Sequence, residues 1–161
     1  MIKLLASTCW GLGLLPKAPG TWGSLFPLLI VLCCGHFEFL IPWLPLILLC
    51  LVASSSLATI SLHPWYQTHF DEKVPPQVVS DEVAGQSIAL LGMAWIEPSN
   101  PILWVSLAMI SFMLFRVLDI WKPCLIYKVQ GIRGGYGVLM DDVLAGIVAG
   151  VAVLGISLMI R

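Results

Sequence analysis

Long apolar stretches without a charge dominate this chain and decide the solvent in which it can fold. Residues 98–115 and 143–160 each give 18 residues without a charge, and residues 40–62 give a longer run. A helix needs about 20 apolar residues to cross the roughly 30 Å hydrocarbon core of a bilayer. Only 11% of the 161 residues are charged, against about 25% in a soluble domain. The sequence therefore predicts an integral membrane protein.

About five hydrophobic helices are predicted to form one all-α membrane bundle over residues 1–161. Residues 24–37 and 83–96 complete the set, and the second has only 14 uncharged residues. Apolar runs of about 10–14 residues also suit helices that lie inside a bundle or re-enter the membrane. The segment 83–96 is therefore expected either to span the bilayer or to lie within the protein.

Threading five spans through a membrane places most charges on one face. Only Glu38, Glu97 and Arg161 fall on the far side, while 14 of the 17 charged residues, with seven of the eight Lys and Arg, fall on the near side. Lys and Arg accumulate on the cytoplasmic side of membrane proteins. The near face is therefore predicted to be cytoplasmic, and three polar segments distant in sequence meet there.

Small residues recur on the last hydrophobic segment, where Gly146 and Gly150 are four residues apart. Small side chains let membrane helices approach closely. We expect packing within the bundle, with dimerisation as the alternative; the sequence does not decide the oligomeric state.

Five carboxylates stand at the near ends of the hydrophobic segments. An acidic pair at a helix start can simply complement the helix dipole, but five carboxylates on one face would repel one another unless a cation lay among them. Hard oxygen ligands suit Mg²⁺. The predicted metal ligands are Asp81, Glu82, Asp119, Asp141 and Asp142, and catalytic roles are assigned to four of them, Asp81, Asp119, Asp141 and Asp142.

Basic and hydroxyl side chains accompany these acids and predict a phosphate site. Arg116, Asp119 and Lys122 recur every three residues before Pro123, which is a pattern of mutual neutralisation or of phosphate binding. The glycine-rich segment 17–24 can expose backbone N–H groups to an anion, or can be an ordinary capped loop. The predicted phosphate ligands are Lys17, Thr21, Ser24, Arg116 and Lys122.

Several functional classes are excluded by what the sequence lacks. The net charge of -1 argues against nucleic-acid binding, and no GxxxxGK[ST] or DGxxAR string supports nucleotide-driven transfer or an alcohol phosphatidyltransferase. The five cysteines have no zinc spacing. A non-enzymatic transporter subunit remains as an alternative, which predicts polar residues through the middle of the bilayer.

Four blocks in order resemble the bacterial phosphatidylglycerophosphatase A family along nearly the whole chain. They are residues 13–24 (GLLPKAPGTWGS), 81–86 (DEVAGQ), 115–123 (FRVLDIWKP) and 134–146 (GGYGVLMDDVLAG). Ser80 stands where the family usually has an apolar residue, and Leu118 where it often has Phe; neither departure removes a charge.

The resemblance implies an all-helical enzyme that hydrolyses phosphatidylglycerophosphate to phosphatidylglycerol and phosphate, with Mg²⁺. It also implies a phospholipid substrate and a multi-pass location in the bacterial inner membrane. Another lipid phosphate as substrate stays open. The attacking group is either a metal-activated water or a carboxylate that forms a phospho-enzyme.

Overall fold

The computed structural model describes residues 1–72, 74–96, 100–122 and 134–160, which are helical with connecting turns and contain no strand. Two short 3₁₀ helices, η1 (Leu12–Leu14) and η2 (Glu38–Trp43), accompany the α-helices. The α-helices are α1 (Ile2–Ser7), α2 (Pro19–His36), α3 (Leu44–Phe70), α4 (Ser80–Leu91), α5 (Pro101–Trp121) and α7 (Gly135–Ile160). The predicted all-α bundle with about five hydrophobic helices is confirmed.

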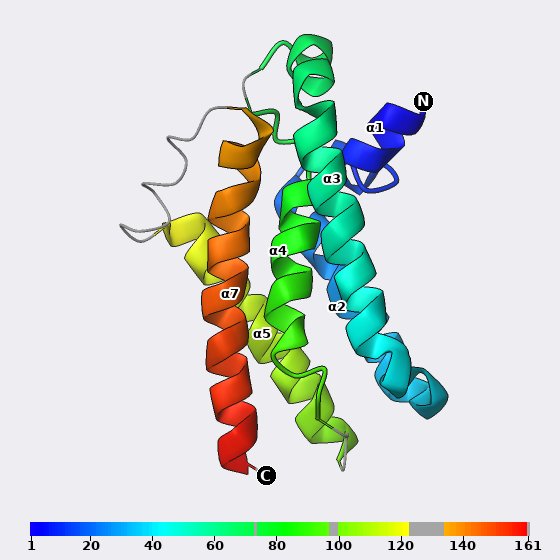
Figure 1. Cartoon of the computed structure of the whole chain (residues 1–161), viewed down its shortest axis with the longest axis vertical. Coiled ribbons are helices and arrows are strands. Elements are labelled where there is room, and N and C mark those ends of the chain that lie inside the picture. Colours follow the sequence, from blue (N-terminus) through cyan, green and yellow to red (C-terminus); the bar gives the residue numbers. More distant parts are fainter. Residues whose placement is uncertain (73, 97–99, 123–133, 161) are drawn as a thin grey trace.

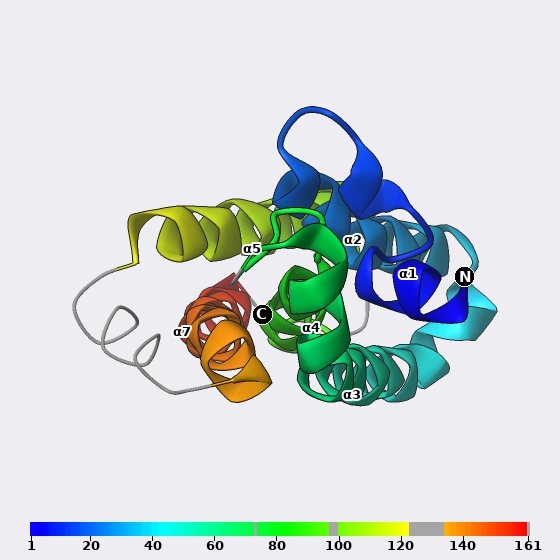
Figure 2. The same cartoon turned by 90° about the horizontal axis from the view of Figure 1, so that it is seen from above.

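Helix α4 lies at the centre of the bundle. It packs against α2, α3, α5 and α7, and the view along the bundle shows it enclosed by these helices (Figures 1 and 2). The side chains of Ala84, Ala89 and Leu90 are fully buried in this position. Helix α1 lies outside this arrangement, against α3.

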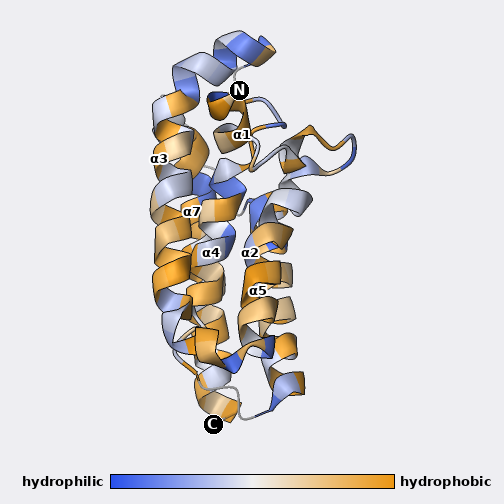
Figure 3. Ribbon diagram, turned by 90° about the vertical axis from the view of Figure 1, so that its right-hand side faces the viewer, coloured by the Kyte–Doolittle hydropathy of each residue, from blue (hydrophilic) through white to orange (hydrophobic). Residues whose placement is uncertain are grey.

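Four helical segments are long and apolar enough to cross a membrane: Pro19–His36, Glu38–Phe70, Pro101–Trp121 and Gly135–Ile160. Helix α4, with 12 residues, is the shortest of the five hydrophobic helices. Its central position corresponds to the second expectation for residues 83–96, a helix inside the bundle. Hydrophobic residues cover most of the bundle, and hydrophilic ones gather toward the end that carries the N-terminus (Figure 3).

At the end of the bundle that carries the acids, the helices extend beyond the predicted apolar runs, whereas at the other end α4 stops at Leu91, inside its predicted run. The proline at position 64 predicts a turn over residues 63–65, after the apolar run 40–62. Helix α3 instead continues through Pro64 to Phe70, so this prediction is wrong. Helix α7 begins at Gly135, eight residues before the predicted start at position 143. The physical reason is that apolar residues mark the hydrocarbon layer, whereas backbone hydrogen bonds continue a helix into the polar region.

Close packing between α4 and α7 depends on glycines. A side chain at Gly146 would meet the backbone of Gly85, and one at Gly92 would meet the backbone of Gly150. The small residues of the last helix therefore serve packing within the bundle, as expected. At the same contact, Gly85 lies against the backbone of Asp142 in the second turn of α7.

Candidate active site

A polar cavity of about 420 Å³ lies where α4 and α7 begin and α5 ends. Asp81 and Glu82 occupy the first turn of α4. Asp141 and Asp142 lie in the second turn of α7, and Asp119 lies in the last turn of α5. All five carboxylates line the cavity, together with Lys122. The structure therefore brings together acidic residues that are up to 61 positions apart in the sequence.

Three of these carboxylates form the tightest group. Asp81, Glu82 and Asp142 each offer one oxygen, and these oxygens lie within 4.8 Å of one another. Among the described residues, the oxygens Asp81 Oδ1 and Glu82 Oε2 are buried without a hydrogen-bond partner. Buried carboxylate oxygens need a partner. The donor set and the unsatisfied oxygens both fit a hard divalent cation such as Mg²⁺.

The other two carboxylates are held by basic side chains. Arg116 donates from one guanidinium nitrogen to Asp119 Oδ2 at 2.7 Å, and Lys122 Nζ donates to Asp141 Oδ2 at 2.6 Å. Charge-assisted contacts of this length are among the stronger hydrogen bonds. The five predicted metal ligands thus divide into a group of three and two ion pairs.

Helix α2 closes one side of the site. The hydroxyl of Ser24 accepts a hydrogen bond from Arg116 at 3.4 Å and donates one to the carbonyl of Gly20 at 2.8 Å. A side chain at Gly20 would overlap the carboxylate of Glu82 and approach Arg116 to 3.3 Å. Gly20 therefore leaves the space in which an acid and a base of the site pack against α2.

Burial and the closeness of like charges shift the pKa values of the ionisable side chains in this site. Burial raises the pKa of Asp81 from 3.8 to about 6, and the charge of Asp141 adds to this increase. Burial, followed by the charge of Asp81, raises the pKa of Glu82 well above its ordinary value. Burial lowers the pKa of Lys122, but the hydrogen bond to Asp141 and the charges of Asp141, Asp142 and Asp119 together outweigh it, so this pKa is raised. A site that disfavours its own negative charges favours a bound cation.

Of the five predicted phosphate ligands, only Lys122 lines this cavity. Arg116 contacts the lining residue Asp119, and Ser24 contacts Arg116. The other two lie farther away. Lys17 is exposed, and its carbonyl accepts a hydrogen bond from the indole of Trp22 at 3.0 Å. Thr21 is half-buried in the first turn of α2. Neither residue lines the cavity. Arg133, which precedes the glycines of the last polar segment, lies outside the described residues.

Residues of α3 line the cavity although they were not predicted for the site. His63 and Gln67 do so directly, and Tyr66 between them is fully buried. The sequence gives only a weak signal for these residues. They are polar side chains that follow the apolar run 40–62, at the same end of the bundle as the acids. Because Pro64 indicated a turn, these residues were not expected on a helix facing the site.

Comparison with known proteins decides the family. The family model described as Phosphatidylglycerophosphatase A matches residues 5–157. The chain belongs to this family. An Escherichia coli protein named "Phosphatidylglycerophosphatase A" is 33% identical over 148 residues, covering 90% of this chain and 77% of its own. A Haemophilus influenzae protein of the same name is 33% identical over 97% of this chain and 88% of its own.

A third relative has a different name. A Bacteroides thetaiotaomicron protein named "Putative phosphatidylinositol-3-phosphatase" is 36% identical over 91% of this chain and 87% of its own. No solved structure matches the chain. Membership of the phosphatidylglycerophosphatase A family makes the chain a lipid phosphatase with membrane-spanning helices.

Proposed function

We propose that the chain hydrolyses the terminal phosphate monoester of phosphatidylglycerophosphate to phosphatidylglycerol and inorganic phosphate, in a reaction that requires Mg²⁺. The observation that carries this proposal is the buried group of Asp81, Glu82 and Asp142, with oxygens within 4.8 Å of one another, beside two basic side chains in a membrane bundle. The family name supports the substrate.

Asp81, Glu82 and Asp142 would hold the metal. Bound there, Mg²⁺ would polarise the phosphoryl group and lower the pKa of an attacking water. Asp119 and Asp141 remain predicted ligands and also orient Arg116 and Lys122.

Arg116 and Lys122 are proposed to bind the phosphate oxygens. Each now contacts a carboxylate, and an incoming phosphate would compete for the same N–H groups. Ser24 keeps Arg116 aligned through its hydroxyl. Lys17 and Thr21 are proposed to contact the substrate at the rim, on the same side of the membrane as the cavity.

The nucleophile is either water or one of the carboxylates. A carboxylate route forms a covalent acyl phosphate that water then hydrolyses. Borohydride trapping followed by peptide mass analysis distinguishes the routes, because borohydride reduces the acyl phosphate of a phosphorylated Asp or Glu and leaves free carboxylates unchanged.

The cavity is proposed to face the cytoplasm of a bacterial inner membrane. Helix α1, the start of α2 and the end of α5 lie at the cavity end of the bundle, and η2 lies at the other end (Figure 1). The first three carry or adjoin Lys3, Lys17 and Lys122, whereas η2 carries Glu38. Basic residues accumulate on the cytoplasmic side. The phosphorylated headgroup would then be presented to the site at the cytoplasmic leaflet.

A second candidate substrate is phosphatidylinositol 3-phosphate, because of the name of the Bacteroides relative. The test is phosphate release by purified protein from that lipid, from phosphatidylglycerophosphate and from phosphatidic acid, with Mg²⁺ or with chelator. We expect preferential, metal-dependent release from phosphatidylglycerophosphate. Preference for the inositol lipid, or release that chelation leaves unchanged, would contradict the proposal.

A further inference from the structure

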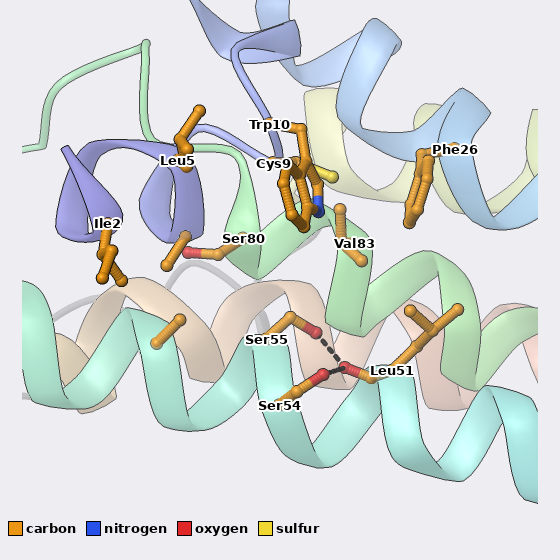
Figure 4. Close-up of a pocket in the computed structure, with 12 residues that line it drawn as sticks. Ile2, Leu5, Cys9, Trp10, Phe26, Leu51, Ser54, Ser55, Ser80 and Val83 are labelled. Atoms are coloured by element: carbon orange, nitrogen blue, oxygen red, sulfur yellow. Dashed lines mark hydrogen bonds between the residues drawn. The ribbon is translucent and has the colours of Figure 1, made fainter.

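A second cavity, of about 320 Å³, lies on the other side of α4 from the acidic site. Four helices and the turn after α1 enclose it (Figure 4). Ile2 and Leu5 of α1, Trp10 of the turn, Phe26 of α2, Leu51 of α3 and Val83 of α4 form its apolar lining. We name this cavity the lateral groove.

The serine hydroxyls of the lateral groove are already satisfied. The hydroxyl of Ser54 donates to the carbonyl of Cys50 at 2.7 Å, and that of Ser55 donates to the carbonyl of Leu51. Ser80 shares a hydrogen bond of 2.7 Å with Thr59. No hydroxyl of these serines needs a partner from an occupant. The lining therefore suits a hydrocarbon rather than a polar ligand.

The surroundings of the lateral groove supply that hydrocarbon. Helices α2 and α3, which form two of its walls, are candidate membrane spans. At its edge, Ile2 is 82% exposed and Trp10 is 78% exposed. Exposed apolar and indole side chains near the end of a span are typical of the membrane interface. An acyl chain in the adjoining leaflet can thus reach the groove without crossing water.

The first turn of α4 separates the groove from the acidic cavity. Ser80 and Val83 line the groove, whereas Asp81 and Glu82 line the acidic cavity. A helix with its side chains is about 10–12 Å wide. The two sites are therefore about one helix width apart, a separation that a phosphorylated headgroup and its glycerol can cover.

Backbone geometry also directs Trp10 toward the groove. Cys9, Trp10 and Gly11 all adopt left-handed conformations, with φ of 48°, 58° and 93°. Two successive non-glycine residues in this region are unfavourable and need support from the surrounding structure. The tight turn that results reverses the chain after α1 and places the indole in the groove wall (Figure 4).

We infer that the lateral groove binds one acyl chain of the phospholipid whose phosphate monoester occupies the acidic cavity. This inference rests on the proposed function, since it assigns the apolar part of that substrate. It implies that a long-chain lipid and its free headgroup differ in how tightly they bind, and so in KM, whereas the rate of the chemical step is the same for both.

The first test is photolabelling, which needs no turnover. The purified protein in nanodiscs is irradiated with phosphatidylglycerol that carries a diazirine in one acyl chain, and labelled peptides are mapped by mass spectrometry. We expect labels to concentrate on α1 and on α3 near Leu51. Labels spread evenly over all lipid-facing helices would overturn the inference.

The second test fills the groove. Ala58→Phe places a ring in the groove lining, whereas Ala53→Phe places the same ring on the exposed face of the same helix. With a long-chain substrate, Ala58→Phe should raise KM by about tenfold or more at unchanged kcat, because it displaces several methylenes. A short-chain, water-soluble analogue should show no such increase, and Ala53→Phe should behave as wild type with both.

The two claims fail separately. If wild-type protein releases no phosphate from any lipid phosphate while the groove is labelled, the proposed function fails and the groove remains a lipid site. If wild-type protein is active but Ala58→Phe leaves KM for the long-chain substrate unchanged, or changes both substrates equally, the groove does not bind the substrate chain.

Discussion

Gly20 shows how much a single residue without a side chain contributes to this site. It occupies the first turn of α2, and both Glu82 and Arg116 pack against it. A methyl group there would need the space that the Glu82 carboxylate now fills. Positioning errors of about 1 Å can reduce an enzymatic rate a hundredfold.

Gly20→Ala should therefore reduce phosphate release by about tenfold or more, through displacement of Glu82 and Arg116. Gly155→Ala is the matched control, because a methyl group at Gly155 meets nothing within 4 Å. Initial rates at saturating Mg²⁺ compare the two. Equal rates would mean that the position of Glu82 does not limit the reaction.

The raised pKa values of two carboxylates, Asp81 and Glu82, predict how the stability of the metal-free protein depends on pH. The pKa of Asp81 is raised from 3.8 to about 6 by burial, so the folded state binds the proton more tightly than the unfolded state does. Stability should then fall as pH rises from about 4 through 6, and Glu82 should extend the fall upward. Melting temperatures with chelator should show this fall, and saturating Mg²⁺ should reduce it; a rise across this window would contradict it.

Lys122 should matter for the rate through its contact with Asp141 at 2.6 Å. Lys122→Met keeps an unbranched side chain but removes the charge, so both the ion pair and a proposed phosphate ligand are lost. We expect Lys122→Met to lower kcat/KM for phosphate release by about tenfold or more. Lys3→Met, at an exposed position of α1, is the control and should keep wild-type kinetics. Wild-type kinetics for Lys122→Met would show that Lys122 is not part of the site.

At the scale of elements, the α4–α7 contact holds the site together. Gly85 lies against the backbone of Asp142 and the ring of Phe115, and Gly146 lies against Gly85. The position of Asp142 beside Asp81 thus depends on how closely two helices approach. Helices of this kind approach only where small residues face each other.

Gly146→Ala should destabilise the protein by about 1–3 kcal/mol, since the added methyl group has no space between α4 and α7. Thermal unfolding in detergent measures the effect, with Gly155→Ala on the same helix as control. Unchanged stability would indicate that the two helices can separate without cost.

The sequence predicted the helices better than it predicted their ends. Apolar runs located α3 and α7 but missed the turns of α3 that carry His63 and Gln67. Hydrophobicity reports the lipid environment, and a helix continues as long as its backbone bonds are satisfied. The acids at 81 and 82 were thus expected before a helix, whereas they form its first turn.

At the scale of the whole molecule, the alternation of spans brings the polar segments to one end. This arrangement was predictable from the charges, because successive hydrophobic segments run in opposite directions and the charged residues gather at alternate ends. The division of the five acids into a group of three and two ion pairs was not predictable. It depends on the packing of α4 within the bundle, which no local pattern specifies.

Orientation in the membrane is testable by cysteine labelling in a variant without native cysteines. Phe39 lies in η2, before α3 begins, and Glu72 follows the end of α3 whose residues His63 and Gln67 line the acidic cavity. Both positions are exposed and are changed to Cys in turn. With an impermeant maleimide on intact spheroplasts, we expect labelling at position 39 and labelling at position 72 only after permeabilisation. The reverse pattern would place the cavity outside the cytoplasm.

The most direct test of metal-dependent phosphatase chemistry is phosphate release from phosphatidylglycerophosphate by Asp142→Asn, titrated with Mg²⁺. Asp71→Asn is the matched control, because Asp71 is exposed and its left-handed backbone tolerates Asn. We predict a loss of about 100-fold or more for Asp142→Asn and wild-type rates for Asp71→Asn. A folded Asp142→Asn variant with wild-type rate and wild-type Mg²⁺ dependence would contradict the assignment of the site.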